Sequence, residues 1–148
     1  MPNWLFFVLG TILCWGAYGP VIHEGQMDLK SPWKAILCVG AAYFVLAVII
    51  PIALLSRETD PFQFTLRGTL FASLGGALGA LGAIFIVGAL RSGGLPAYVM
   101  PLVFAGAPLV SVVVASLIHP PQDAPSPFLY LGYLLAVAGG GMVLYFKP

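Results

Sequence analysis

The chain has 148 residues, of which 60% are hydrophobic and only 7% are charged. Soluble domains carry about 25% charged residues, so this composition excludes an ordinary water-soluble protein and indicates a membrane protein. The formal net charge is only +1, and Lys and Arg are scattered along the chain. No basic patch is present, so nucleic acid is not expected as a partner.

The sequence carries no recognisable catalytic or metal-binding motif. Cys14 and Cys38 both lie within apolar stretches, without a CxxC spacing or a Cys/His cluster, so we expect two small buried hydrophobic residues rather than a metal or redox site. There is no phosphate-binding loop, no Ser/His/Asp set and no pair of carboxylates within an apolar segment. We therefore expect neither an enzyme nor a cofactor.

Five apolar segments reach the length of about 20 residues that a helix needs to cross a bilayer. They cover residues 4–22, 33–55, 68–90, 97–118 and 128–146, and the charged residues lie between them or at their ends. Nothing alternates with the period of a β-barrel strand. We expect an all-α integral membrane protein, a single five-helix domain over residues 1–148 with its ends on opposite sides. Met1 to Asn3 carry no Lys or Arg, so the first segment is expected to be a permanent span rather than a signal peptide.

One face of the first segment combines aromatic and hydroxyl side chains at helical spacing. Its members are Thr11, Trp15, Tyr18 and Ile22. Cys14 lies next to this face, and Pro20 removes the backbone donor that would pair with the Gly16 carbonyl. Two interpretations stay open: a neutral aromatic wall that binds a substrate in a cavity, or an interfacial aromatic residue together with a packing tryptophan.

His23 and Glu24 are the only adjacent titratable pair. A helix that starts at Trp4 uses its membrane-crossing length by His23, which places Glu24 at the headgroup boundary. The pair is therefore either part of a solvated loop or a functional charge pair at the mouth of a cavity. The polar residues between Gln26 and Ser31 are expected to form a loop.

The third and fourth segments form a predicted hairpin around a turn at Arg91–Pro96. Small residues share one face of the third segment, which favours close helix contact in lipid; they are Ala72, Gly76, Gly79 and Ala83. In the fourth segment, Pro108 leaves the Phe104 carbonyl free in mid-membrane. Pro108 is also expected to bend the helix, and the bend either shapes a pocket or improves packing. Ser111 offers a hydroxyl for a single hydrogen bond.

The remaining features concern helix ends and packing. Pro51 is expected to kink the second segment near its end, and residues 56–67 are expected to form a solvated connector. The proline-rich stretch 119–127 is expected to be stiff and non-helical. The last segment has another small face suited to helix contact, at Gly132, Ala136 and Gly140.

Three short motifs carry a resemblance to a known family. They are Cys14-Trp15-Gly16, the run Gly88-Ala89-Leu90-Arg91-Ser92 continuing to Pro101, and Leu131-Gly132 with Gly139 to Tyr145. With them, the chain resembles one half of an EamA-like drug/metabolite transporter. The resemblance implies a fold of ten helices in two inverted five-helix repeats, of which this chain supplies one. It therefore implies a partner, either a second copy or another membrane subunit. Family members often carry an acidic residue after the fourth helix, whereas His119-Pro120-Pro121 stands here, so no charged gate is carried over.

We expect a transporter of a small neutral or weakly polar solute in the inner or plasma membrane, because no span carries the central charge that proteins keep there for function. The alternative is a non-transporting subunit of a larger membrane complex. One side of the membrane would receive four Lys and Arg residues and the other two, a small difference that read literally puts the N-terminus outside. The four are Lys30, Lys34, Arg91 and Lys147, and the two are Arg57 and Arg67. Such a balance predicts weak or dual orientation, and with it an antiparallel homodimer.

Overall fold

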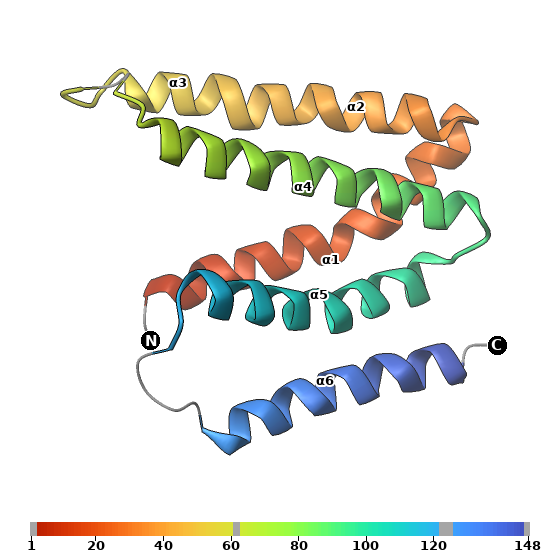
Figure 1. Cartoon of the computed structure of the whole chain (residues 1–148). Helices are drawn as coiled ribbons and strands as arrows, with labels where there is room; N and C mark the ends of the chain where they lie inside the picture. Colours follow the sequence, from red (N-terminus) through yellow and green to blue (C-terminus); the bar gives the residue numbers. More distant parts are fainter. Residues whose placement is uncertain (1–2, 61–62, 122–125, 147–148) are drawn as a thin grey trace. The chain divides into compact units, whose positions relative to one another are not determined.

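The computed structural model describes residues 3–60, 63–121 and 126–146, and these ranges contain helices and turns but no strand. The elements are α1 (Asn3–Leu29), α2 (Pro32–Phe44), the π-helical segment η1 (Val45–Ile49), α3 (Ile50–Leu55), α4 (Leu66–Arg91), α5 (Pro96–Ile118) and α6 (Pro127–Tyr145) (Figure 1). Since α2, η1 and α3 are continuous, the described chain has five helices long and apolar enough to cross a membrane. The predicted all-α class and the five membrane-length helices are confirmed.

Capping side chains and prolines mark where the helices begin. The side chains of Ser31, Thr65 and Ser126 accept hydrogen bonds from N–H groups in the first turns of α2, α4 and α6, at 3.4, 3.2 and 3.3 Å. These bonds satisfy backbone donors that have no partner inside the helix. Three helices also carry a proline at their start, where its fixed φ suits the helix and its missing N–H is not needed: Pro32, Pro96 and Pro127.

Helix α1 continues to Leu29, well past the predicted end at residue 22. The predicted loop between Gln26 and Ser31 is therefore wrong for Gln26 to Leu29, which are helical, whereas Lys30 and Ser31 do connect α1 to α2. Hydropathy marks where a helix leaves the hydrocarbon, whereas its backbone hydrogen bonds can carry it on into the headgroup region. The helix ends where Lys30 adopts a positive φ of 51°, and Pro32 then begins α2.

The second span responds to Pro51 with a change of helix type. The π-helical segment η1 lies just before it, and the chain continues as α3. Pro51 has no N–H to donate, and its ring crowds the carbonyl of Ala47 in a regular α-helix. A wider π-turn relieves that crowding without ending the helix. The sequence thus located the irregularity, and the structure shows its form.

The chain divides into two compact units. Unit 1 consists of residues 1–19 and 94–148, and unit 2 of residues 20–93. One boundary falls at Pro20 inside α1, where the helix lacks one backbone donor. The other follows Gly93, whose φ of 93° is accessible to glycine and strained for other residues. The single five-helix domain stays a prediction.

In unit 1, α5 and α6 form an antiparallel hairpin (Figure 1). Gly140 of α6 is buried, and a Cβ built on it would lie only 2.6 Å from the Cβ of Ala105 in α5. The two backbones therefore approach closely at this point. The first part of α1 meets α5 at the buried pair Gly19 and Met100, where a Cβ on Gly19 would overlap the Met100 side chain.

In unit 2, the continuous α2–α3 helix runs antiparallel to α4 (Figure 1). The buried residues of unit 2 lie near the end of α1, the start of α2 and the end of α4. They are Ile22, Gln26, Ala35, Ala83, Ile86, Val87 and Leu90. The first half of α4 is exposed.

Both cysteines are exposed, Cys14 in unit 1 and Cys38 in unit 2. The expectation that they are buried is therefore wrong. Lipid tails are as apolar as leucine side chains, so an apolar residue in a membrane helix does not need a protein partner.

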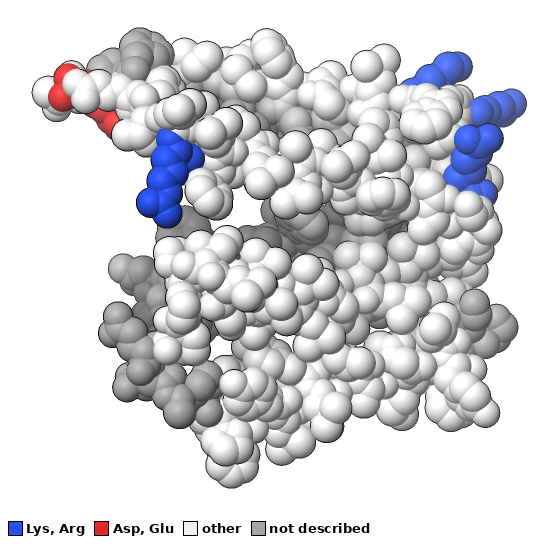
Figure 2. Space-filling model, viewed as in Figure 1, with Lys and Arg blue, Asp and Glu red and all other residues white. Residues whose placement is uncertain are grey.

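Charged side chains gather toward the helix ends of unit 2 (Figure 2). The described residues of unit 1 contain no Asp, Glu, Lys or Arg. Lys30, Lys34 and Arg91 lie where α1 ends, α2 begins and α4 ends, whereas Arg57 and Arg67 flank the connector at the other end. Lys147 and residues 122–125, which entered the predictions above, lie outside the described residues.

Candidate functional site

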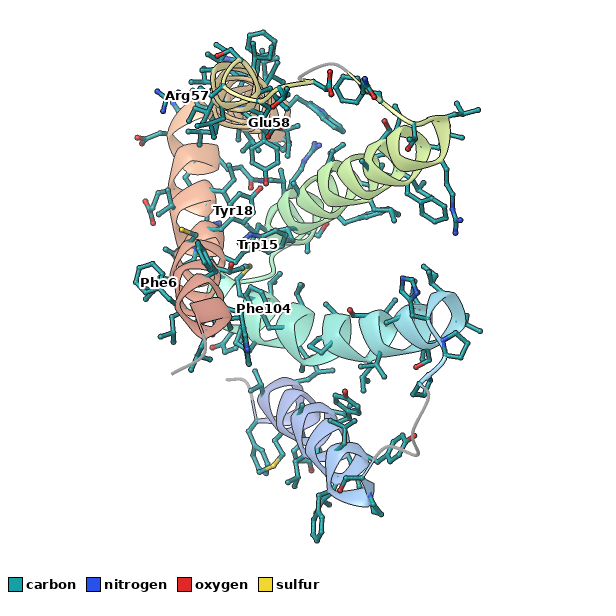
Figure 3. The ribbon with its side chains drawn as sticks, turned by 90° about the vertical axis from the view of Figure 1, so that its left-hand side faces the viewer. Phe6, Trp15, Tyr18, Arg57, Glu58 and Phe104 are labelled. Carbon is teal, nitrogen blue, oxygen red and sulfur yellow. The ribbon has the colours of Figure 1, made fainter. Side chains whose placement is uncertain are left out.

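The aromatic face predicted in the first segment meets α5 in unit 1. Trp15 packs against Phe104 with ring centroids 6.5 Å apart and ring planes 63° apart, the edge-to-face geometry that aromatic pairs prefer. Figure 3 shows the two side chains approaching each other from α1 and α5, with Tyr18 on the same stretch of α1. The Tyr18 hydroxyl is buried, whereas Trp15 keeps 46% of its surface exposed.

One face of α5 carries the two residues that meet α1, Met100 and Phe104. Its members are spaced four, four and three residues apart, which keeps them on one side of a helix: Met100, Phe104, Pro108 and Ser111. The contacts Gly19–Met100 and Trp15–Phe104 step by four residues in opposite directions along the two helices.

The two contacts between α1 and α5 differ in exposure. Gly19 and Met100 are buried, Trp15 and Phe104 are 46% and 39% exposed, and the residues beyond them are exposed. The latter are Thr11, Pro108 and Ser111. The contact at Gly19 and Met100 is therefore buried, whereas the aromatic pair and Thr11 are accessible.

The chemistry of these two faces is neutral. Aromatic rings and the Met100 thioether offer stacking and polarisable contacts. The Thr11 hydroxyl donates to the Phe7 carbonyl at 2.9 Å, so its hydrogen is used within α1 and only its oxygen lone pairs remain available. Cys14 is a free, exposed thiol on the neighbouring face of α1. Such a surface suits an uncharged solute with an apolar or aromatic part.

The structure does not bring His23 and Glu24 together as a pair. Both lie in α1, where adjacent residues point in different directions. Glu24 is exposed, while His23 is partly buried and its Nδ1 has no hydrogen-bond partner among the described residues. Gln26, assigned to a loop by the sequence, is buried, and its Nε2 donates to the Val87 carbonyl at 3.4 Å.

The sequence analysis did not identify Met100 and Phe104 as the residues of α5 that contact α1, nor Gln26 as a buried residue. A signal existed for each. Phe104 lies four residues before Pro108, and Met100 lies four residues before Phe104, so the three share one helix face. Gln26 follows Ile22 by four residues and so continues the face that starts at Thr11.

The predicted packing residues differ in their surroundings. Ala83 and Gly140 are buried, whereas an added Cβ at Gly76, Gly79 or Gly132 would meet nothing within 4 Å. Ala72 and Ala136 are exposed. The small face in the first half of α4 thus has no partner within the described residues of unit 2, and association through it stays a prediction. In the parts of the chain that the structure describes, no group of three His, Cys, Asp or Glu residues could hold a metal ion.

Comparison with known proteins gives no relative: no family model, curated protein or solved structure matches this chain.

Proposed function

We propose that this chain is a half-size membrane transporter of a small neutral or weakly polar solute, built as one EamA-like repeat and working as a dimer. The observation that carries the proposal is the half-exposed Trp15 beside Phe104. Trp15 lies near the middle of the membrane-length helix Trp4–Leu29, whereas membrane tryptophans that serve as anchors gather at the two interfaces. Trp15 at mid-span is therefore not placed as an interfacial anchor, and its exposed ring can stack against a solute.

The lack of charge on this surface supports a neutral solute. A charged group at the centre of a membrane helix costs about 2.5–3.5 kcal/mol on insertion scales, so such groups are kept where function needs them. The described residues of unit 1 carry none. Glu24 is exposed and lies near the end of α1, so we do not assign it the role of a buried proton-coupling carboxylate.

Two features support a dimer of repeats. The small face of α4, with Gly76 and Gly79, is open to a partner helix, and small faces drive helix association in lipid. Among the described residues, Lys and Arg are nearly balanced between the two ends of unit 2, as described above. A chain that inserts in both orientations could assemble an inverted pair around a midplane site, as in transporters with inverted repeats.

The same open face favours the alternative function, a non-transporting subunit that packs into a larger membrane complex. In that case the α4 face would bind a different protein, and the aromatic pair would only position α1 on α5. The two functions differ in what Trp15 does, so uptake by the purified chain separates them.

The test is uptake of two uncharged nucleosides, radiolabelled uridine and radiolabelled thymidine, into proteoliposomes, each without a proton gradient. We expect uptake of at least one of them by the wild type, and about a ten-fold reduction in Trp15→Ala and in Phe104→Ala, the loss that matches about 1.4 kcal/mol of aromatic contact. Trp33→Ala is the matched control, because Trp33 is an exposed tryptophan at the start of α2 in unit 2. It should transport like the wild type.

A Glu24→Gln variant should also transport normally. Loss of uptake in Glu24→Gln with Trp15→Ala unaffected would favour proton coupling instead. If the wild type moves neither compound while the chain is recovered as part of a stable complex with another membrane protein, the subunit function is the better explanation.

A further inference from the structure

Gln26 is the only buried polar residue among those that the structure describes, at 8% exposure. It lies in the part of α1 that belongs to unit 2, against α4. Its Nε2 donates to the Val87 carbonyl at a long 3.4 Å, while its Oε1 is buried and has no partner. Buried polar atoms are nearly always hydrogen-bonded, so we expect the Oε1 acceptor to bind a hydrogen-bond donor from outside the chain.

His23 presents a second buried acceptor on the same side of α1. Its Nδ1 is buried and has no partner within the described ranges. His23 precedes Gln26 by three residues, a spacing that places two side chains as neighbours on one helix face, with Cβ atoms about 5–6 Å apart. An amide oxygen always accepts, and Nδ1 accepts when the imidazole hydrogen is on Nε2.

Both acceptors offer lone pairs, so a ligand at this place has to supply hydrogens. Helix α1 ends at Leu29 and helix α4 at Arg91, and both ends lie next to the buried residues of unit 2. The partial negative charge of these helix C-termini is offset by Lys30, Lys34 and Arg91 at the same end. The neighbouring buried residues are apolar, among them Val87 and Leu90. A ligand here gains most by donating two hydrogen bonds.

We propose that His23 Nδ1 and Gln26 Oε1 form a polar site in unit 2 that takes a group with two hydrogens on one nitrogen or oxygen. Water, a primary amide and a primary ammonium share this chemistry, because each can donate to both acceptors at once. The site is distinct from the aromatic faces of unit 1, and it does not rest on the proposed transport function.

The ligand enters when the end of α1 separates from α4. Both acceptors are buried in the structure, and the Gln26–Val87 bond is the one described side-chain hydrogen bond that joins residues 20–29 to α4. Opening breaks this single long bond and allows two buried acceptors to gain partners. A purely structural arrangement would behave differently: His23 would carry its hydrogen on Nδ1 and donate it directly to Gln26.

The test uses the full chain in lipid nanodiscs with ¹⁵N-labelled histidine imidazoles. The chain has only two histidines, so His119 gives an internal control signal. Acetamide and methylammonium are titrated separately. We expect a saturable shift of the His23 Nδ1 signal with at least one of them, or, if water is the ligand, a water cross-peak at His23 Nδ1 without either solute. The His119 signal should stay unchanged throughout.

Variants connect the signal to the two acceptors. Gln26→Leu should raise the half-saturating concentration, or weaken the water cross-peak, by about ten-fold, as expected when a hydrogen bond to a buried acceptor is lost. Glu24→Gln, at an exposed neighbour, is the matched control and should change neither. Because Gln26→Leu could also disturb the α1–α4 contact, a second pair of variants is prepared with ¹⁵N-labelled glutamine and read on the Gln26 side-chain amide. His23→Asn keeps an acceptor near the position of Nδ1 and should preserve binding, whereas His23→Leu should abolish it.

Three results would overturn the proposal. The first is a His23 Nδ1 that is protonated in the wild type and coupled to the Gln26 side chain. The second is the absence of both a solute-dependent shift and a water cross-peak. The third is an equal response in His23→Asn and His23→Leu, which would show that the acceptor at this position has no role.

Discussion

Replacing Gly140 with alanine tests how closely α5 and α6 pack in unit 1. The new Cβ would start 2.6 Å from the Cβ of Ala105, whereas non-bonded carbon atoms rest about 3.5–4.0 Å apart. Neither Cβ can rotate away, because each is fixed to its backbone. The two helices must therefore separate by about 1 Å, a gap that forfeits a quarter to a half of the dispersion energy across the contact. We expect Gly140→Ala to destabilise the protein by about 1–3 kcal/mol, the usual range for overpacking.

The flanking glycines supply matched controls. A Cβ at Gly139 or Gly141 would meet nothing within 4 Å, so alanine there should be neutral or stabilise the helix by up to about 1 kcal/mol through its better helix propensity. Unfolding is measured on the full chain in dodecyl maltoside micelles by SDS titration with circular dichroism. Adding Ala105→Gly to Gly140→Ala should restore most of the loss, with a clear coupling energy in the double-mutant cycle. If Gly140→Ala is as stable as the flanking variants, or if Ala105→Gly does not rescue it, the close approach is refuted.

Further predictions concern the α1–α5 contact, a helix cap and the topology. Gly19→Ala should cost about 1 kcal/mol, because its Cβ would lie 2.5 Å from the Met100 sulfur; Gly16→Ala, with nothing within 4 Å, should cost nothing in the same SDS titration. Thr65→Ala should lose about 1 kcal/mol by removing the cap of α4, and an unchanged midpoint would show that the cap contributes nothing. Reporter tags on the two ends of the chain should report opposite compartments, and tags in one compartment would contradict five spans. One Lys added at a terminus should shift the population of orientations, and a fixed orientation would argue against dual insertion.

The sequence alone determined the class of the protein and the positions of most helices. In a bilayer every backbone N–H and C=O must be satisfied within the chain, so an apolar segment of sufficient length has to be a helix. Four of the five spans therefore match the prediction closely. The first does not, because hydropathy reports where α1 leaves the hydrocarbon and not where its hydrogen bonds stop. The turn at Gly93 and the irregularity before Pro51 followed from local chain chemistry as well.

Only the tertiary structure decided which faces meet. The spacing of Trp15 and Tyr18 defined a face, yet nothing in that spacing identified Phe104 as its partner on α5. Gly132 and Gly140 share a predicted packing face, but only Gly140 is pressed against a neighbour. In water, the hydrophobic pattern separates inside from outside, because apolar surface is driven away from the solvent. Lipid solvates every apolar face equally well, so the pattern that places a helix in the membrane carries no information about the neighbour it will contact.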